Sequence, residues 1–102
     1  MAAFELVLQF RGPRVETEDE VVEIEDALFE LFAEGEAWEG HEIGTAARSI
    51  FVATDDAQAT FARLSPFLLR AGLMEHVIAA ARPTATERYT TLWPRGHAFS
   101  RA

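Results

Sequence analysis

The sequence predicts an α+β fold, a two-layer sandwich in which two helices cover one face of an antiparallel sheet. Three observations predict it. Apolar and polar residues alternate in a first strand-like segment, two later segments have helical apolar spacing, and turn residues separate the elements. The resulting order, β-α-β-β-α-β with an added C-terminal strand, is that of the split βαβ or ferredoxin-like arrangement. Another two-layer arrangement of the same elements is the alternative.

Length and composition predict one folded domain. The 102 residues, 49% of them hydrophobic and 25% charged, fit a single domain spanning residues 1–102. The absence of cysteine excludes a disulfide scaffold, thiol catalysis and a cysteine-ligated metal. A formal net charge of −8, with no lysine in the chain, argues against a nucleic-acid partner, which needs clustered basic residues.

The N-terminal residues predict a cytoplasmic location. They lack the basic and apolar regions of a signal peptide, and Glu5 stands where such a peptide would be apolar. No apolar run approaches the roughly 20 residues that span a bilayer, so we expect no membrane contact.

The first half of the chain predicts a strand, a helix and a second strand. Apolar and polar side chains alternate in residues 4–10, with the apolar set facing the helices. Thr17 and Glu20 fit a capping box that begins a helix over residues 18–34, which a glycine follows. Residues 36–44 predict a strand that is bulged near its central glycine.

The second half predicts a buried central strand over residues 48–54, a helix and two more strands. Asp55, followed three residues later by glutamine, fits a capping pattern for the helix, which Pro66 must kink or end. Strands are predicted over residues 74–82 and 87–93, the last lying beside the fourth strand at the edge of the sheet.

An acidic block dominates the first half. Twelve of the 17 acids, and none of the nine arginines, lie from Glu16 to Glu42. Five of them repeat at helical spacing and form one stripe on the predicted first helix: Asp19, Glu23, Asp26, Glu30 and Glu34. Such a stripe is either a solvated outer face or a surface that attracts a basic protein partner.

The sheet face without helices is also predicted to be apolar. In the central strand, Ile50 and Val52 alternate with Phe51 and Ala53, which leaves neither face polar. The C-terminal tail with Phe99, a ligand or a second copy can cover this open face, and a sheet-to-sheet homodimer is the expected solution. The residues expected on the open face or at its interface are Val7, Gln9, Phe51, Tyr89 and Trp93.

No motif for catalysis, a cofactor or a metal is complete. His41 and Glu42 begin a zinc-protease motif, but Thr45 stands where its second histidine must be. Phosphate-binding glycine loops and nucleotide-binding fingerprints are absent. Glu39 and His41 could pair as an oriented base, although two ordinary residues of an edge strand explain them better. We therefore expect no metal, no cofactor and no catalytic residue.

Three segments, over residues 38–44, 49–55 and 89–94, resemble small bacterial proteins of ferredoxin-like fold. The shared features are an acid-glycine pair before a second glycine, a strand with Ile-Phe and a closing Leu-Trp-Pro. Ser49 departs from the asparagine of that pattern. The resemblance covers most of the chain and implies the fold, but that group has no established activity.

Two functions of different classes follow. The first is a non-enzymatic acidic binding or regulatory domain that self-associates through the open sheet face. The second is a small dimeric ferredoxin-like enzyme, or a ligand-binding domain, with a sheet-lined cavity in which His76, Tyr89 or the Glu39–His41 pair would act. The lack of a catalytic constellation favours the first. A tightly filled open face indicates an interface, whereas a pocket with convergent polar groups indicates a ligand.

Overall fold

A computed structural model describes residues 2–100 and contains a five-stranded antiparallel sheet and two α-helices. The elements are, in order, β1 (Phe4–Arg11), α1 (Glu18–Phe29), β2 (Ala37–Ile43), β3 (Ala47–Thr54), α2 (Ala57–Arg70), the 3-10 turn η1 (Met74–His76), β4 (Val77–Pro83) and β5 (Thr90–Trp93). The predicted α+β class and the predicted order of helices and strands are confirmed.

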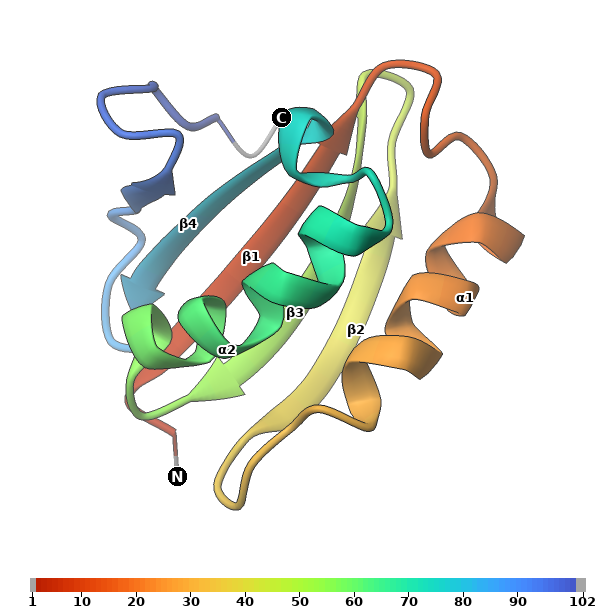
Figure 1. The fold of residues 1–102 in the computed structure, drawn as a ribbon. Helices are drawn as coiled ribbons and strands as arrows, with labels where there is room; N and C mark the ends of the chain where they lie inside the picture. The colour runs from red at the N-terminus through yellow and green to blue at the C-terminus, as the bar shows by residue number, and fades with distance from the viewer. Residues whose placement is uncertain (1, 101–102) are drawn as a thin grey trace.

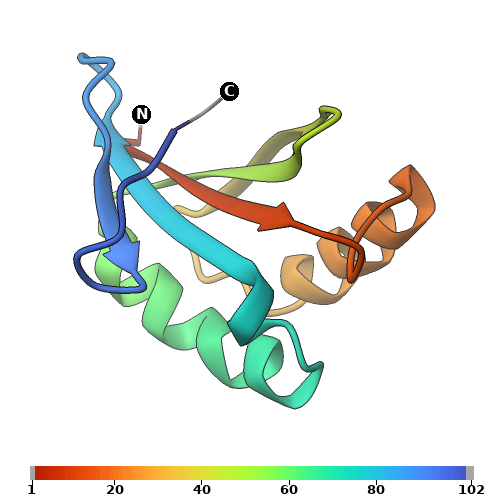
Figure 2. The ribbon, with the colours of Figure 1, turned by 90° about the horizontal axis from the view of Figure 1, so that it is seen from above.

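The strands lie in the order β2-β3-β1-β4-β5, and each neighbouring pair is antiparallel. Both helices lie against the same face of the sheet, as Figures 1 and 2 show. The strand β5 extends the edge beside β4, as predicted. The other edge is β2, which runs beside α1 (Figure 1).

The core lies between the helices and the sheet. Leu6 pairs with Val52, and Leu8 pairs with Ile50, across the β1–β3 ladder. All four side chains are fully buried and belong to one core cluster with buried residues of α1 and α2, which confirms that they face the helices. Burial of each such side chain stabilises the fold by about 1.5–3 kcal/mol.

The helix α1 begins where the sequence predicts but ends earlier. The hydroxyl of Thr17 accepts the N–H of Glu20, and the Glu20 carboxylate accepts the N–H of Thr17. The predicted end at residue 34 is wrong, because the helix ends at Phe29. Its last turn carries no base to complement the negative end of the helix dipole. In addition, the N–H of Ala33 donates to the Glu36 carboxylate and not to the carbonyl of Phe29, as it would in a continued helix.

The N-cap of α2 is Asp56, one residue later than predicted. Its carboxylate accepts the N–H of Ala59, whereas Asp55 accepts the N–H of Ala3 before β1. The helix continues through Pro66 to Arg70, so the proline does not end it. The carbonyl of Ala62, which lacks the N–H partner that Pro66 cannot supply, belongs to an exposed residue, where water can serve as its partner.

Two strand starts differ from the prediction. Residues 74–76 form η1 and not the beginning of β4, because the N–H of His76 donates to the carbonyl of Leu73 and closes a turn. The strand β5 begins at Thr90 and not at residue 87. The guanidinium of Arg82 donates to the carbonyls of Thr84 and Thr86 and holds the preceding segment as a loop.

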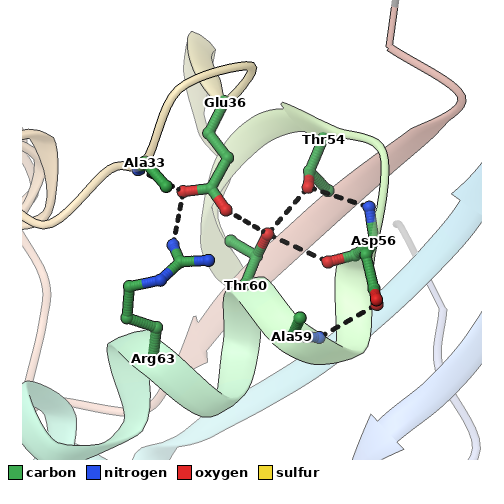
Figure 3. Close-up of polar contacts among 7 residues, drawn as sticks. All are labelled: Ala33, Glu36, Thr54, Asp56, Ala59, Thr60 and Arg63. Carbon is green, nitrogen blue, oxygen red and sulfur yellow. Dashed lines mark hydrogen bonds and ion pairs between the residues drawn. The ribbon is translucent and has the colours of Figure 1, made fainter.

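A polar cluster ties the loop after α1 to the start of α2 (Figure 3). The carboxylate of Glu36 accepts hydrogen bonds from the N–H of Ala33, the Thr60 hydroxyl and the Arg63 guanidinium. The hydroxyl of Thr54, at the end of β3, lies 2.7 Å from that of Thr60. The Glu36 side chain is 7% exposed. Burial alone would raise the pKa of Glu36, but these hydrogen bonds outweigh it and hold the pKa below its usual 4.5.

Candidate functional site

One surface combines exposed apolar side chains with acidic ones, on the outer side of α1 and the adjacent edge strand β2. Four of the six large apolar side chains that are exposed among the described residues belong to it: Val22 (38%), Phe29 (67%), Trp38 (47%) and Ile43 (43%). Among and beside them lie Glu18, Asp19, Glu23, Glu25, Asp26, Glu30 and His41. We call these eleven residues the α1–β2 face.

Helical spacing arranges this surface on α1. Val22 and Phe29 are two turns apart and lie on one line along the helix. Glu18 and Glu25 have the same spacing, and each precedes an apolar member of the line by four residues. The residues buried in the core occupy another side of the helix, which leaves Val22 and Phe29 available for a partner.

A β-bulge turns both Trp38 and His41 toward α1. Trp38 pairs with Val52 and His41 with Ile50, and both partners face the helices. In a regular strand, residues three apart point to opposite faces. The register shift between Trp38 and Gly40 removes this constraint, and the φ of +127° at Gly40 is one that glycine tolerates.

His41 lies between two carboxylates of α1. Its Nδ1 is 2.9 Å from Oε2 of Glu25, and its Nε2 is 3.0 Å from Oε2 of Glu18. Glu25 also accepts the indole N–H of Trp38. The side chains of Glu25, His41 and Glu18 are 9%, 18% and 67% exposed. An imidazole donates to two carboxylates only when both nitrogens are protonated, so this geometry fits the imidazolium.

The two carboxylates raise the pKa of His41 above its usual 6.5. The hydrogen bond to Glu18 is the largest cause. Partial burial acts in the opposite direction, and the hydrogen bond to Glu25 and the charges of both carboxylates add to the increase. The imidazolium therefore neutralises part of the acidic surface from within.

This arrangement fits neither a general base nor a metal site. A base needs a ring nitrogen directed at its substrate, whereas each nitrogen of His41 already faces a carboxylate. Because Glu18 and Glu25 bind opposite nitrogens of the ring, they cannot converge with it on one ion. Within residues 2–100, no group of three or more histidine and acidic side chains is placed to hold a metal.

The other side chains considered for catalysis lie apart. Glu39 is exposed, and the carboxylates that contact His41 come from α1 instead. His76 ends η1 before β4, which β1 and β3 separate from β2. Tyr89 donates its hydroxyl to Glu5, 3.1 Å away. The structure therefore does not bring the predicted catalytic candidates together.

Most of the predicted acidic stripe is present on the α1–β2 face. Asp19, Glu23 and Asp26 are exposed on α1, and Glu30 is its exposed C-cap residue. Glu34 lies in the loop after the helix, so its predicted place in the stripe is wrong. The shortened helix is the reason, since the helical spacing that would align Glu34 ends at Phe29.

No arginine among the described residues forms an ion pair with this stripe, although Arg14 lies near Glu20 and lines the same groove as Glu23. Arg48 is buried, and its guanidinium donates to the carbonyls of Val15 and Gly12. Arg63 is paired with Glu36 in the polar cluster of Figure 3. The exposed acids of α1 therefore keep an attraction for an external cation.

The chain's own C-terminal tail lies over part of the open sheet face. Val7 and Gln9 are fully buried there, and Phe51 is 7% exposed. The amide of Gln9 donates to the carbonyl of Ser100, 2.8 Å away. Figure 2 shows the tail on the side of the sheet opposite the helices. The burial of Phe51 therefore needs no second copy, and the homodimer stays a prediction.

The other two residues predicted for this face differ in position. Tyr89 lies on the open face, where its ring is 4.8 Å from that of Phe99. Trp93 pairs with Ala79, a residue of the helix-side core, and donates its indole N–H to the carbonyl of Met74. Trp93 therefore lies apart from Val7, Gln9 and Phe51, at the β5 edge.

Two of the hollows in the described surface lie away from the open sheet face. A groove of about 240 Å³ between α1 and α2 is lined by Glu23, Ile24 and Phe67, among others. A second hollow, of about 360 Å³, lies at one end of the sheet against Phe4 and Leu92. Neither is lined by the open-face residues, so neither is the cavity that the enzyme alternative requires.

The sequence alone did not identify Glu18, Glu25 and Trp38 as neighbours of His41. The detectable signal is that Glu18 and Glu25 lie seven residues apart, as do Val22 and Phe29. The second pair gives the helix more apolar residues than its core-facing side needs. The bulge was predicted, but its effect on the side-chain directions was not.

Among the described helices, neither α1 nor α2 is long and apolar enough to cross a membrane. Comparison with known proteins found no matching family model, no matching curated protein and no matching solved structure.

Proposed function

We propose that the protein is a non-enzymatic binding module that holds a basic, partly apolar segment of another protein on the α1–β2 face. The observation that carries this proposal is the overlap of two features on one surface. Val22, Phe29, Trp38 and Ile43 are exposed there, and unneutralised acids surround them. Burying the apolar side chains supplies binding energy, while the acids attract and orient a basic partner.

Charge favours a basic segment as the occupant. Two copies that met through this face would bring acids against acids, because a two-fold interface uses the same patch on both subunits. A nucleic acid would present phosphates to the same carboxylates. A segment with arginine or lysine beside leucine or an aromatic residue satisfies both parts of the surface.

The edge strand favours binding through side chains and not through an added strand. The bulge between Trp38 and Gly40 interrupts the regular hydrogen-bonding row of β2. Bulges and charged residues at a sheet edge oppose pairing with another strand. The partner segment is therefore expected to lie across α1 and β2.

A peptide-binding experiment tests the proposal. The probe is a synthetic peptide in which arginine alternates with leucine, and its controls replace either arginine by glutamate or leucine by serine. Binding is followed by the fluorescence of Trp38 in a Trp93→Phe background. The test variant is Glu23→Arg with Glu30→Arg. The matched control, Glu75→Arg with Glu87→Arg, changes the net charge equally at exposed positions outside this face.

The expected result is binding of the arginine–leucine peptide alone, weakened by salt and abolished by the α1 variant. Charges separated by more than about 8–10 Å are screened at physiological ionic strength. Equal loss of binding in the control variant would show a nonspecific charge effect and contradict the proposal. Self-association that Phe29→Ser abolishes would identify a second copy as the occupant and also contradict it.

We also propose that the chain has the ferredoxin-like topology. Its support is the order of the elements and the interior position of β1 and β3 in the sheet. The relationship to small bacterial proteins of that fold, the cytoplasmic location and self-association through the open sheet face stay predictions.

A further inference from the structure

We propose that His41 is a proton-controlled latch between α1 and β2: the imidazolium bridges Glu18 and Glu25, and loss of its proton releases Glu18 to the surface. The latch itself is a property of the free protein. Its effect on a partner rests on the function proposed above, since Glu18 and Glu25 belong to the α1–β2 face.

The geometry of the bridge supplies the switch. Nε2 of His41 is 3.0 Å from Glu18, and Nδ1 is 2.9 Å from Glu25. A neutral imidazole carries one N–H, so one of the two carboxylates must then face a nitrogen lone pair. On that side the hydrogen bond is replaced by a repulsive contact between the lone pair and the carboxylate. The neutral ring therefore cannot keep both carboxylates bound.

The surroundings decide which carboxylate is released. Glu25 is 9% exposed and also accepts the indole N–H of Trp38, so it keeps a partner in place. Glu18 is 67% exposed and lies in the first turn of α1, where water can solvate it at once. The remaining proton therefore stays on Nδ1, where it is donated to Glu25. The Glu18 carboxylate loses its hydrogen bond to Nε2 and becomes solvated.

Among the described residues, the charged groups that face His41 are Glu18 and Glu25 of α1, and no basic group opposes this change. On β3, the cross-strand partner of His41 is the apolar Ile50. Arg48, two residues away on the same face of β3, is held by the carbonyls of Val15 and Gly12. On β2, Glu42 pairs with Ser49 on the alternate face. The acids of α1 are thus the groups that respond to the proton on His41.

A titration of the free protein tests the latch without any partner. The ring signals of His41 are followed by NMR and assigned with His76→Gln and His97→Gln. His41 is expected to titrate above 6.5, and Glu18→Gln is expected to move its midpoint down. The matched control Glu23→Gln removes an equal charge from an exposed position on α1. Equal shifts in the two variants, or a His41 midpoint at or below 6.5 in the wild type, would overturn the latch.

A binding measurement then tests its effect. The arginine–leucine peptide is titrated into the wild type and into His41→Gln at pH values below and above the measured midpoint. Release of Glu18 is expected to tighten binding by the wild type about two- to fivefold, the range of one exposed charge contact, and His41→Gln is expected to remove this pH dependence. The regulation is overturned if the wild-type affinity stays constant while His41 titrates. Absence of peptide binding at every pH would overturn the proposed function, whereas the NMR titration decides the latch independently.

Discussion

Replacing Glu36 by glutamine tests how much the polar cluster of Figure 3 stabilises the fold. The Glu36 side chain is 7% exposed and accepts three hydrogen bonds, from Ala33, Thr60 and Arg63. Glutamine keeps the shape, but its amide end turns a donor toward one of these donors. Hydrogen bonds to a charged group contribute about 1.5–3 kcal/mol, whereas Arg63, at 38% exposure, makes a solvent-screened pair that contributes less than about 1 kcal/mol.

We therefore expect Glu36→Gln to lower the free energy of unfolding by about 2 kcal/mol. For a domain of this size, that loss lowers the melting temperature by about 8–16 °C. Urea unfolding followed by circular dichroism measures it, and Glu39→Gln, an exposed acid of the neighbouring strand, is the control. Equal unfolding free energies for the two variants would refute the reasoning.

The pH dependence gives an independent check. Because the pKa of Glu36 is lowered in the fold, its contribution to stability is complete above 4.5 and is lost as pH falls through the lowered value. The difference in unfolding free energy between the wild type and Glu36→Gln should therefore shrink in acid. A difference that stays constant to the lowest pH at which both proteins fold would mean that the ionised carboxylate is not its source.

Four further outcomes are expected. Thr17→Ala removes half of the capping box and should cost about 1 kcal/mol in urea unfolding, and a cost near zero would contradict the capping geometry. His41→Gln should lower the free energy of unfolding most below pH 6.5, and its difference from the wild type should vanish as pH rises through the raised pKa of His41. A difference in unfolding free energy that grows with pH would contradict the bridge. Phe51→Glu places a charge at a site that is 7% exposed in one copy and should destabilise the monomer by about 3–5 kcal/mol. If the variant instead keeps its stability and sedimentation shows that a dimer dissociates, the homodimer is supported. Deleting residues 94–102 should uncover the open sheet face and increase binding of an apolar dye, and unchanged dye binding would show that the tail does not cover it.

The elements that the sequence predicts correctly are those with local signals. The alternation in β1 has a period of two residues, and the capping box of α1 involves side chains three residues apart. Both signals act within one element and do not depend on the rest of the fold. The helix-side core follows from them, because the apolar members of each pattern must meet one another.

The features that the sequence does not reveal depend on distant contacts. Where α1 ends is coupled to Glu36, whose carboxylate also binds Arg63 on another helix. The neighbours of His41 depend on a bulge in one strand and on the rotation of α1 above it. A seven-residue repeat of acids is visible in the sequence, but only the packed structure shows that a histidine lies between them.

The open sheet face shows why apolar residues on both sides of a strand do not by themselves predict a dimer. The pattern of Phe51 and Val7 requires that something cover them. Both are buried within one copy, where the tail accepts a hydrogen bond from Gln9 of the same face through the Ser100 carbonyl. Because the tail is joined to the sheet through β5, its effective concentration at this face is about millimolar, as for short flexible linkers. A second copy must therefore bind this face more strongly than the tail does before it can displace the tail. Within residues 2–100, no segment covers Val22, Phe29, Trp38 and Ile43 of the α1–β2 face in this way, so they are the side chains available to a partner.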